Sequence, residues 1–366
     1  MTAAEETADQ LRRPGWWPWL WRELAPFPGR EIMTLRMVVA VVMVTMISMT
    51  LQTPDTAVSA YMVFFVSKEN RALTLLTGIG LVIGATMGVA VSLFFYRYTF
   101  DYPELRIPVM AVTVFTGMFL SRALVFGPLG FAIGFVVAVT QSMAELAPDA
   151  DALVRVMLWA WVFLVFPVVL TVIVSQILLP AKTGPSAGTH AANTRHGLFV
   201  PDAFSNPNYV RFALKVTLAA MSCYVCYMGL DWPGIHTAFI TCCFIALENT
   251  AATIHKGRLR LAGCAVGGML GFLSIMYLIP YMESITSLLL LTAAGSVLAG
   301  WVAAGSQRIA YAGLQIALAF FMCIFQGFAP GTNFTTIRDR LVGIILGLVV
   351  SSVIFLYLWP ERGADA

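Results

Sequence analysis

Long apolar runs recur along the chain and are separated by short polar stretches. Many of these runs reach about twenty residues, which is enough for a helix to cross the hydrocarbon core of a bilayer. Six segments come before the polar stretch that begins near residue 180, and six come after it. In chain order the predicted helices span 33–53, 57–67, 73–96, 107–121, 124–143, 154–179, 209–229, 234–247, 258–279, 284–303, 307–326 and 339–359.

The polar stretches divide the chain into five parts. Residues 1–32 form a cytoplasmic or interfacial N-terminal segment, whose sequence "RRPGWWPWLWREL" mixes tryptophan with arginine as the headgroup layer favours. The two six-helix units are 33–180 and 207–360. Between them, 181–206 is a cytoplasmic linker rich in Gly, Pro, Ser and Asn, and 361–366 form a C-terminal tail.

The two units are related by an internal repeat. Residues 35–88 align with 214–267 without a gap when the chain is shifted by 179 positions, and the identities include a proline, a Glu-Asn pair and three glycines. Chance matching of apolar residues does not account for that register, so the halves are interpreted as a duplicated unit. An even number of helices in each half gives both copies the same orientation.

Lysine and arginine fall mainly in loops on one side of the predicted helices. When the N-terminus is placed inside, most of the 22 basic residues lie on the inner side. The fold predicted is therefore an all-α integral membrane protein with about twelve transmembrane helices, arranged as two parallel six-helix repeats with both termini cytoplasmic.

Composition agrees with this class and excludes several others. The chain is 59% apolar and 11% charged, with a mean hydropathy of +0.82. A net charge of +3 does not indicate a nucleic-acid partner. The sequence contains no nucleotide-binding Gly-x-x-x-x-Gly-Lys motif, no hydrolase constellation and no metal-ligand spacing, so we predict neither an enzyme nor a cofactor. The six cysteines lie in apolar segments and are interpreted as packing residues.

The repeated Glu-Asn pair follows an unusually short apolar run in each half. The pairs are Glu69 with Asn70 and Glu248 with Asn249. A carboxylate held near hydrocarbon has a raised proton affinity, so these four residues are candidates for proton coupling. The alternative is structural, because glutamate and asparagine at this position can also cap the free amides that open the next helix.

Basic residues beside the apolar segments are candidates for binding an anion. The second half adds the sequence "HKGRLR" where the first half has few charges, and each half begins its first helix near a basic residue. Snorkelling and loop charges that fix topology are the alternatives. The candidate substrate-binding residues are Arg36, Lys215, Lys256, Arg258, His255 and His236.

Glycines recur at four-residue spacing in "GIGLVIGATMG" and "GRLRLAGCAVGGMLG". Small residues at this spacing allow neighbouring helices to approach closely. We therefore expect tight helix packing along these two segments.

Several of these features together resemble a known family. A helix with a basic start, a proline at its outer end, a short helix, a polar turn and then "RLRLAGCAVGGMLGF" is similar to the fusaric acid resistance family of inner-membrane proteins, which is related to the aromatic acid exporters. Weaker similarities lie in "QRIAYAGLQIALAF" and "YLWP". The chain resembles a short form that lacks the large cytosolic domain many members insert between the halves.

The resemblance implies export of aromatic or hydrophobic carboxylic acids and related toxic compounds across the bacterial inner membrane, and hence drug resistance. It also implies a periplasmic adaptor and an outer-membrane channel as partners, beside the organic anion and the lipid bilayer; a homo-oligomer is a further arrangement to test. Proton-coupled efflux is the function expected. Two alternatives remain, a passive organic-anion channel and a non-transporting membrane scaffold for an adaptor protein.

Overall fold

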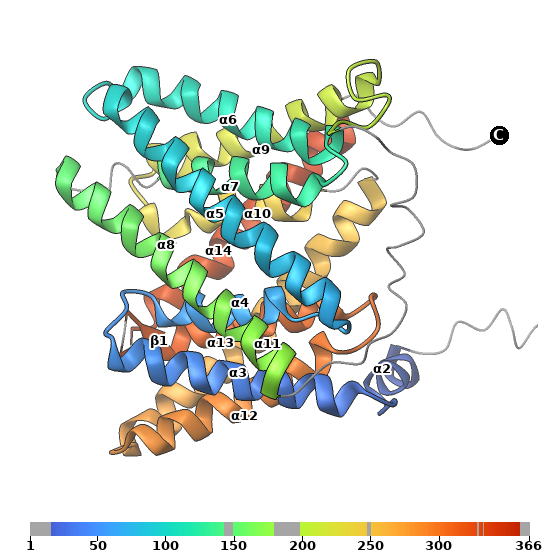
Figure 1. Ribbon diagram of the computed structural model, residues 1–366, viewed down its shortest axis with the longest axis vertical. Helices are drawn as coiled ribbons and strands as arrows, with labels where there is room; N and C mark the ends of the chain where they lie inside the picture. Colours follow the sequence, from blue (N-terminus) through green and yellow to red (C-terminus); the bar gives the residue numbers. More distant parts are fainter. Residues whose placement is uncertain are drawn as a thin grey trace, which may run out of the picture.

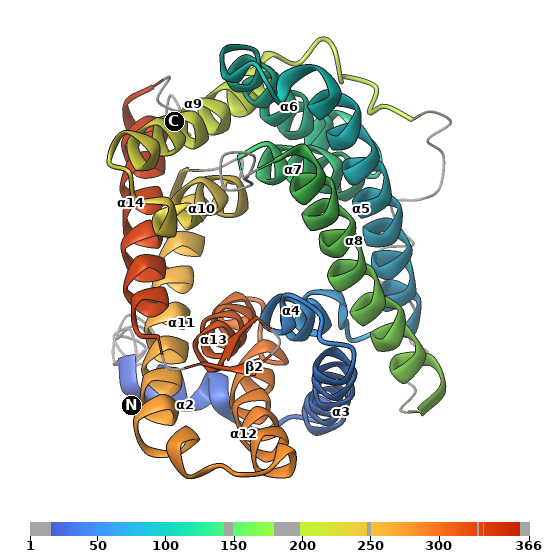
Figure 2. The same ribbon diagram turned by 90° about the vertical axis from the view of Figure 1, so that its left-hand side faces the viewer.

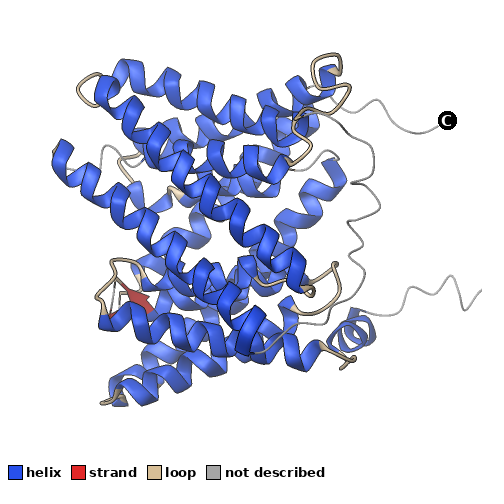
Figure 3. Cartoon of the chain, viewed as in Figure 1, coloured by secondary structure: helices blue, strands red, loops and turns tan. Residues whose placement is uncertain are grey.

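The computed structural model describes residues 16–142, 149–178, 198–246, 250–327, 329–331 and 333–358, and these residues are almost entirely helical (Figures 1 and 3). Two short antiparallel strands, β1 (Phe325–Gln326) and β2 (Ala329–Pro330), form a small hairpin. The α-helices are α2 (Trp16–Leu24), α3 (Arg30–Thr50), α4 (Thr56–Val66), α5 (Arg71–Thr99), α6 (Pro103–Ala123), α7 (Gly127–Ser142), α8 (Ala150–Ile173), α9 (Pro207–Gly229), α10 (Thr237–Ile245), α11 (Thr250–Tyr277), α12 (Ile285–Ala303), α13 (Ala310–Ile324) and α14 (Thr335–Tyr357).

Eight of the described helices are long and apolar enough to cross a membrane, namely α3, α5, α6, α8, α9, α11, α12 and α14. Four shorter apolar segments contain α4, α7, α10 and α13. The predicted class, an all-α membrane protein, is therefore confirmed. Each of the twelve predicted segments overlaps one of these helices. The largest difference is at α11, which begins at Thr250 and not at residue 258, because "HKGRLR" continues the helix and does not form a loop.

The helices of the second half follow those of the first at a nearly constant distance along the chain. Helix α4 begins at residue 56 and α10 at 237, α5 at 71 and α11 at 250, and α6 at 103 and α12 at 285. These differences lie close to the shift of 179 that aligns the two sequences. The correspondence reaches α8 and α14, well beyond the segment in which residue identity is visible.

Helices from both halves share the two largest hydrophobic cores. One core combines α3 and α4 with α12 and α13, and the other combines α9 and α10 with α6 and α7. Helix α3 packs on α12, and its counterpart α9 packs on α6. In Figure 2 the first core lies below and the second above, with α5 and α8 along the right side and α11 and α14 along the left.

The glycine segments lie where two helix pairs approach closely, as their spacing predicts. A Cβ at Gly263 on α11 would overlap Gln315 and the Ala312 backbone on α13, and a Cβ at Gly84 on α5 would overlap Ala132 on α7. Gly84 and Gly263 are equivalent in the repeat. Only glycine allows these approaches, and the one at Gly263 brings Gln315 against the helix that carries Arg260.

Candidate functional site

The two short helices α4 and α10 meet through equivalent phenylalanines. The rings of Phe65 and Phe244 lie edge to face with their centroids 6.4 Å apart. Phe131 and Phe135 on α7 lie against Phe244 at 5.5 and 4.7 Å. All four side chains are half-buried. We call these four residues the phenylalanine cluster; they offer apolar ring faces and edges between the two halves of the chain.

A buried arginine lies beside this cluster. Arg260 on α11 is 2% exposed, and its guanidinium carbon lies 5.9 Å from the centre of the Phe244 ring. Its Nε donates a hydrogen bond to the Thr241 hydroxyl at 3.1 Å. Its Nη1 donates to the Tyr311 hydroxyl at 3.3 Å and to the Gln315 side-chain oxygen at 3.0 Å. Residues from α10, α11 and α13 therefore hold the guanidinium in place.

Two lysines bring further positive charge to the same region. Lys256 precedes Arg260 by one helical turn, and its Nζ lies 5.0 Å from the centre of the Tyr311 ring, which Arg260 also contacts. Lys68, in the turn after α4, places its Nζ 5.7 Å from the centre of the Phe65 ring. Burial lowers the pKa of Lys68. Each of the two equivalent phenylalanines thus has a basic side chain over its ring.

The charge on Arg260 has only neutral hydrogen-bond partners in the part of the chain that the structure describes. A buried charge without a partner of opposite sign is costly, since desolvation is not repaid by attraction. A bound anion would supply that attraction. The arrangement can therefore bind a carboxylate at Arg260 and an aromatic ring against the phenylalanine cluster.

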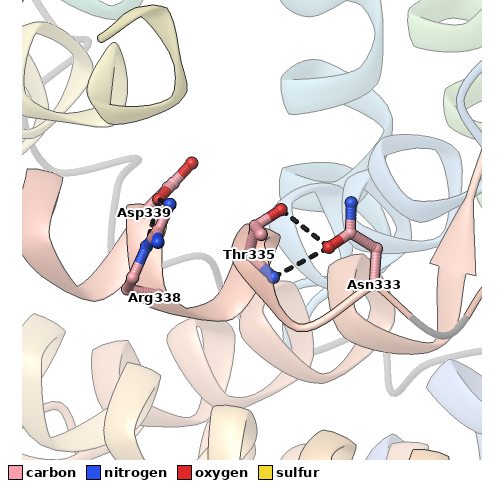
Figure 4. A network of polar contacts seen from close by, with 4 residues as sticks. All are labelled: Asn333, Thr335, Arg338 and Asp339. Carbon is pink, nitrogen blue, oxygen red and sulfur yellow. Dashed lines mark hydrogen bonds and ion pairs between the residues drawn. The ribbon is translucent and has the colours of Figure 1, made fainter.

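Helix α14, which packs against α11, begins with a network of polar contacts. The first turn of α14 is fixed by Asn333, whose side-chain oxygen accepts hydrogen bonds from the Thr335 backbone N–H at 2.9 Å and from its hydroxyl at 2.7 Å (Figure 4). Arg338 and Asp339 form an ion pair at 2.8 Å in the next turn. Arg340 follows on the same helix, and its buried Nε has no hydrogen-bond acceptor among the described residues.

The structure brings one of the predicted anion contacts, Lys256, next to Tyr311, a hydrogen-bond partner of Arg260. The two basic residues near the starts of α3 and α9 make other contacts. Arg36 is 2% exposed, and its Nη2 donates to the Lys68 carbonyl at 2.6 Å, at the end of α4. Lys215 is 6% exposed and lies over the Phe355 ring at 5.3 Å.

The remaining predicted anion contacts lie apart from Arg260. His255 and Arg258 are exposed on α11. His236, just before α10, is half-buried, and its Nδ1 lies 3.0 Å from the Pro233 carbonyl oxygen.

The first Glu-Asn pair lies in the turn between α4 and α5. Asn70 caps α5, because its side-chain oxygen accepts a hydrogen bond from the Ala72 N–H at 2.9 Å. Glu69 is exposed beside it. The contact at Asn70 is the helix-cap arrangement that was the alternative to proton exchange. Glu248 and Asn249 lie outside the described residues.

Sequence reasoning missed the central residues of the site, although a signal for them was present. Arg260 and Arg340 stand at the very start of the predicted segments 258–279 and 339–359, where charges that fix topology are expected, but both lie within helices. Lys256 and Arg260 are four residues apart, as are Tyr311 and Gln315. That spacing places each pair on one helix face. Two polar pairs on helices lined with small residues were the available clue.

The site is asymmetric within the duplicated fold. At the position 179 residues before Arg260, within the segment in which the two halves align, the first half has Leu81. Packing alone does not require an arginine here, because the first half builds the equivalent helix without one. The second half therefore carries chemistry that the first half lacks.

Comparison with known proteins places this chemistry in a class of membrane protein. Residues 216–357 match the family described as "Fusaric acid resistance protein-like". A segment of 166 residues is 40% identical to "Multidrug resistance protein MdtO" of Escherichia coli O157:H7, and covers 45% of this chain and 24% of that protein. A segment of 158 residues is 25% identical to "Inner membrane protein YccS" of Escherichia coli K12, and covers 42% of this chain and 21% of that protein. No solved structure matches the chain.

The resemblance to the fusaric acid resistance family is therefore confirmed over residues 216–357, and the long apolar helices make the chain a multi-pass membrane protein. The matched segment spans about a quarter of the length of these curated relatives. Thr241, Arg260, Tyr311, Gln315 and Arg340 all lie within the residues that match the family.

Proposed function

We propose that the chain is an inner-membrane efflux transporter for aromatic or hydrophobic carboxylic acids and related toxic compounds. The observation that carries this proposal is the buried Arg260 guanidinium, which has neutral hydrogen-bond partners and lies beside four half-buried phenylalanines. The names of the relatives, a multidrug resistance protein among them, support an efflux role.

The proposed substrate class follows from the two parts of the site. Arg260 offers planar N–H donors that match a carboxylate or a sulfonate, and the phenylalanine cluster offers a surface for an aromatic ring. Lys256 lies one helical turn before Arg260 on α11, so it provides a first contact for an anion that approaches along this helix. The other candidate anion contacts, Arg36, Lys215, Arg258, His255 and His236, would act at the approaches to the site.

The proposed membrane arrangement has twelve helices in two parallel repeats, with both termini cytoplasmic. The nearly constant spacing between equivalent helices supports the repeat. In this arrangement α11 begins at the cytoplasmic face, and Arg260 lies about 15 Å along it at about 1.5 Å per residue, near the middle of the bilayer. A substrate anion held there is halfway across.

Proton coupling through Glu69, Asn70, Glu248 and Asn249 remains part of the proposal, as do a periplasmic adaptor and an outer-membrane channel. Exchange of a proton for an anion would let the pH gradient drive export. Glu69 lies exposed in the turn after α4.

Flux from proteoliposomes tests the function and its coupling. Proteoliposomes that contain the wild type or the Glu69→Gln/Glu248→Gln double variant would be loaded with 2-naphthalenesulfonate. This fluorescent aromatic anion does not cross lipid as a neutral acid. We expect saturable, protein-dependent efflux that an imposed pH gradient accelerates in the wild type. The double variant is expected to lose that acceleration while keeping its basal flux.

The other outcomes separate the alternatives. Flux that follows membrane voltage and ignores the pH gradient would identify a passive anion channel. Unchanged acceleration in the folded double variant would make the two glutamates structural. The neutral analogue 2-naphthalenemethanol, corrected for its leak through protein-free vesicles, should show no protein-dependent flux. An absence of protein-dependent flux of the sulfonate would overturn the proposed function.

A further inference from the structure

Gln315 on α13 is fully buried, and only one end of its side-chain amide is satisfied. Its Oε1 accepts a hydrogen bond from Arg260 Nη1 at 3.0 Å, and the Cys264 thiol lies 3.7 Å from the same oxygen. Its Nε2 is buried and has no acceptor among the described residues. A buried N–H donor without an acceptor is unfavourable, so this amide nitrogen calls for an explanation.

The orientation of the Gln315 amide is fixed by the arginine. A guanidinium group only donates hydrogen bonds, so the amide atom that faces it must be the oxygen. Turning the amide over would place its NH₂ group against the guanidinium and remove the bond at 3.0 Å. Because both amide atoms are bonded to one carbon, Nε2 lies beside the oxygen that Arg260 contacts. An acceptor that binds Nε2 is therefore also close to the guanidinium.

Arg260 has unused donors of its own. Its Nε donates to the Thr241 hydroxyl, and its Nη1 donates to Tyr311 and Gln315. Its Nη2 donates to no residue in the part of the chain that the structure describes. The Thr241 hydroxyl donates to the Thr237 carbonyl at 2.6 Å, so its hydrogen is already used. The groups left for a ligand on Arg260 Nη2 and Gln315 Nε2 are thus N–H donors.

Holding Arg260 in place does not by itself account for a glutamine here. A glutamate has nearly the same shape, and its carboxylate would both accept the hydrogen bond and neutralise the buried guanidinium. Glutamine fixes the guanidinium and leaves its positive charge available. It also adds a neutral donor next to that charge, in the otherwise apolar sequence "LQIALAF".

We propose that Gln315 is a second ligand contact, whose Nε2 donates a hydrogen bond to an oxygen of the anion that Arg260 binds. A site built from N–H donors accepts a group whose oxygens are all acceptors, such as an ionised carboxylate or sulfonate. It rejects a neutral ligand of the same shape that carries its own N–H, because donor would face donor. Gln315 therefore sets the selectivity for the anion. This inference rests on the proposed function, because it adds a residue to the same site.

The experiment compares two ligands of nearly the same shape, 2-naphthalenesulfonate and 2-naphthalenesulfonamide. The second has an NH₂ group in place of one oxygen and is neutral at pH 7. Binding of each is titrated with the purified full-length wild type, Gln315→Glu and Gln315→Met. Elution as a single species and a cooperative unfolding transition would establish that each variant is folded. Gln315→Glu should be at least as stable as the wild type, because it pairs the buried guanidinium with a carboxylate.

We expect the wild type to bind the sulfonate about 30-fold or more tightly than the sulfonamide. In Gln315→Glu the Kd of the sulfonate should rise about 30-fold or more, because like charges then meet. The Kd of the sulfonamide should fall about threefold or more, because the carboxylate accepts its N–H. A residue that only positions Arg260 would not produce this gain. Gln315→Met should weaken sulfonate binding about tenfold without improving sulfonamide binding.

The matched control is Gln176→Glu, since Gln176, just after α8, also pairs with an arginine. Its side-chain oxygen accepts a hydrogen bond from Arg71 Nε at 3.0 Å. We expect this variant to change neither Kd more than threefold. The same reversal of preference in Gln176→Glu would assign the effect to net charge and overturn the inference.

The remaining outcomes also decide the question. Sulfonamide binding that does not improve in folded Gln315→Glu, or wild-type sulfonate affinity in Gln315→Met, would overturn the inference and leave the proposed function standing. If Gln315→Glu does not fold, the sulfonate affinity of Gln315→Met decides alone. A wild type that does not bind the sulfonate would overturn both the inference and the proposed function.

Discussion

Replacing Arg260 with glutamine is expected to weaken binding of an aromatic anion by about 2–4 kcal/mol, roughly 30- to 1,000-fold in Kd. The reason is that the Arg260 side chain on α11 is buried and its guanidinium lies beside the Phe244 ring of the phenylalanine cluster. Glutamine retains polar atoms for Thr241 and Tyr311 but removes the charge. Arg260→Lys keeps the charge without the planar fork and should lose less affinity. Titration with 2-naphthalenesulfonate measures each Kd.

The matched control is Arg258→Gln, which removes an exposed arginine from the same helix. We expect it to change the Kd less than threefold at moderate salt, because exposed charges are screened by ions. Stability gives a second test. An uncompensated buried charge is destabilising, so Arg260→Gln without ligand should unfold at the wild-type temperature or above it. Normal binding by a folded Arg260→Gln protein would remove Arg260 from the site.

The fold was largely predictable because its main determinants are written locally in the sequence. Apolar length located the twelve helices, and the break after each short run located the ends of α4 and α10. Even the tight packing at Gly84 and Gly263 followed from spacing alone. The sequence did not predict that each of the two large cores combines helices from both halves. Which apolar helix faces pack together depends on the complementarity of their shapes, and these helices lie far apart in the sequence.

The site was harder to predict, because its residues come together only through that packing. Arg260 looks like an ordinary charge at the cytoplasmic end of a helix when α11 is taken to begin at residue 258, and Tyr311 and Gln315 stand in an apolar segment. Their contact depends on α11 and α13 approaching at glycines. The Glu-Asn pair drew attention because it is repeated. Repetition selects what the fold needs, as the cap at Asn70 illustrates, whereas Arg260 has Leu81 at its equivalent position in the first half.

Adding one methyl group at Gly134 is expected to destabilise the protein by about 1–3 kcal/mol, although alanine is the better helix former. Gly134 on α7 faces Gly117 on α6, and a Cβ on either glycine would overlap the backbone of the other. Neither helix can relieve that overlap by turning a side chain, so the pair must move apart. Thermal unfolding in detergent, followed by tryptophan fluorescence, should show a lower midpoint for Gly134→Ala.

Gly268→Ala is the matched control, since a Cβ there would meet Ile337 Cγ2 at 3.5 Å, an ordinary contact distance. That substitution should leave the unfolding midpoint unchanged or raise it, because alanine lowers the entropy of the unfolded chain. An equal response of the two variants would mean that α6 and α7 do not pack at these glycines. Since α7 carries Phe131 and Phe135, a displaced α7 should also weaken binding of 2-naphthalenesulfonate in folded Gly134→Ala. The close packing of Gly117 and Gly134 therefore also fixes the position of the phenylalanines on α7.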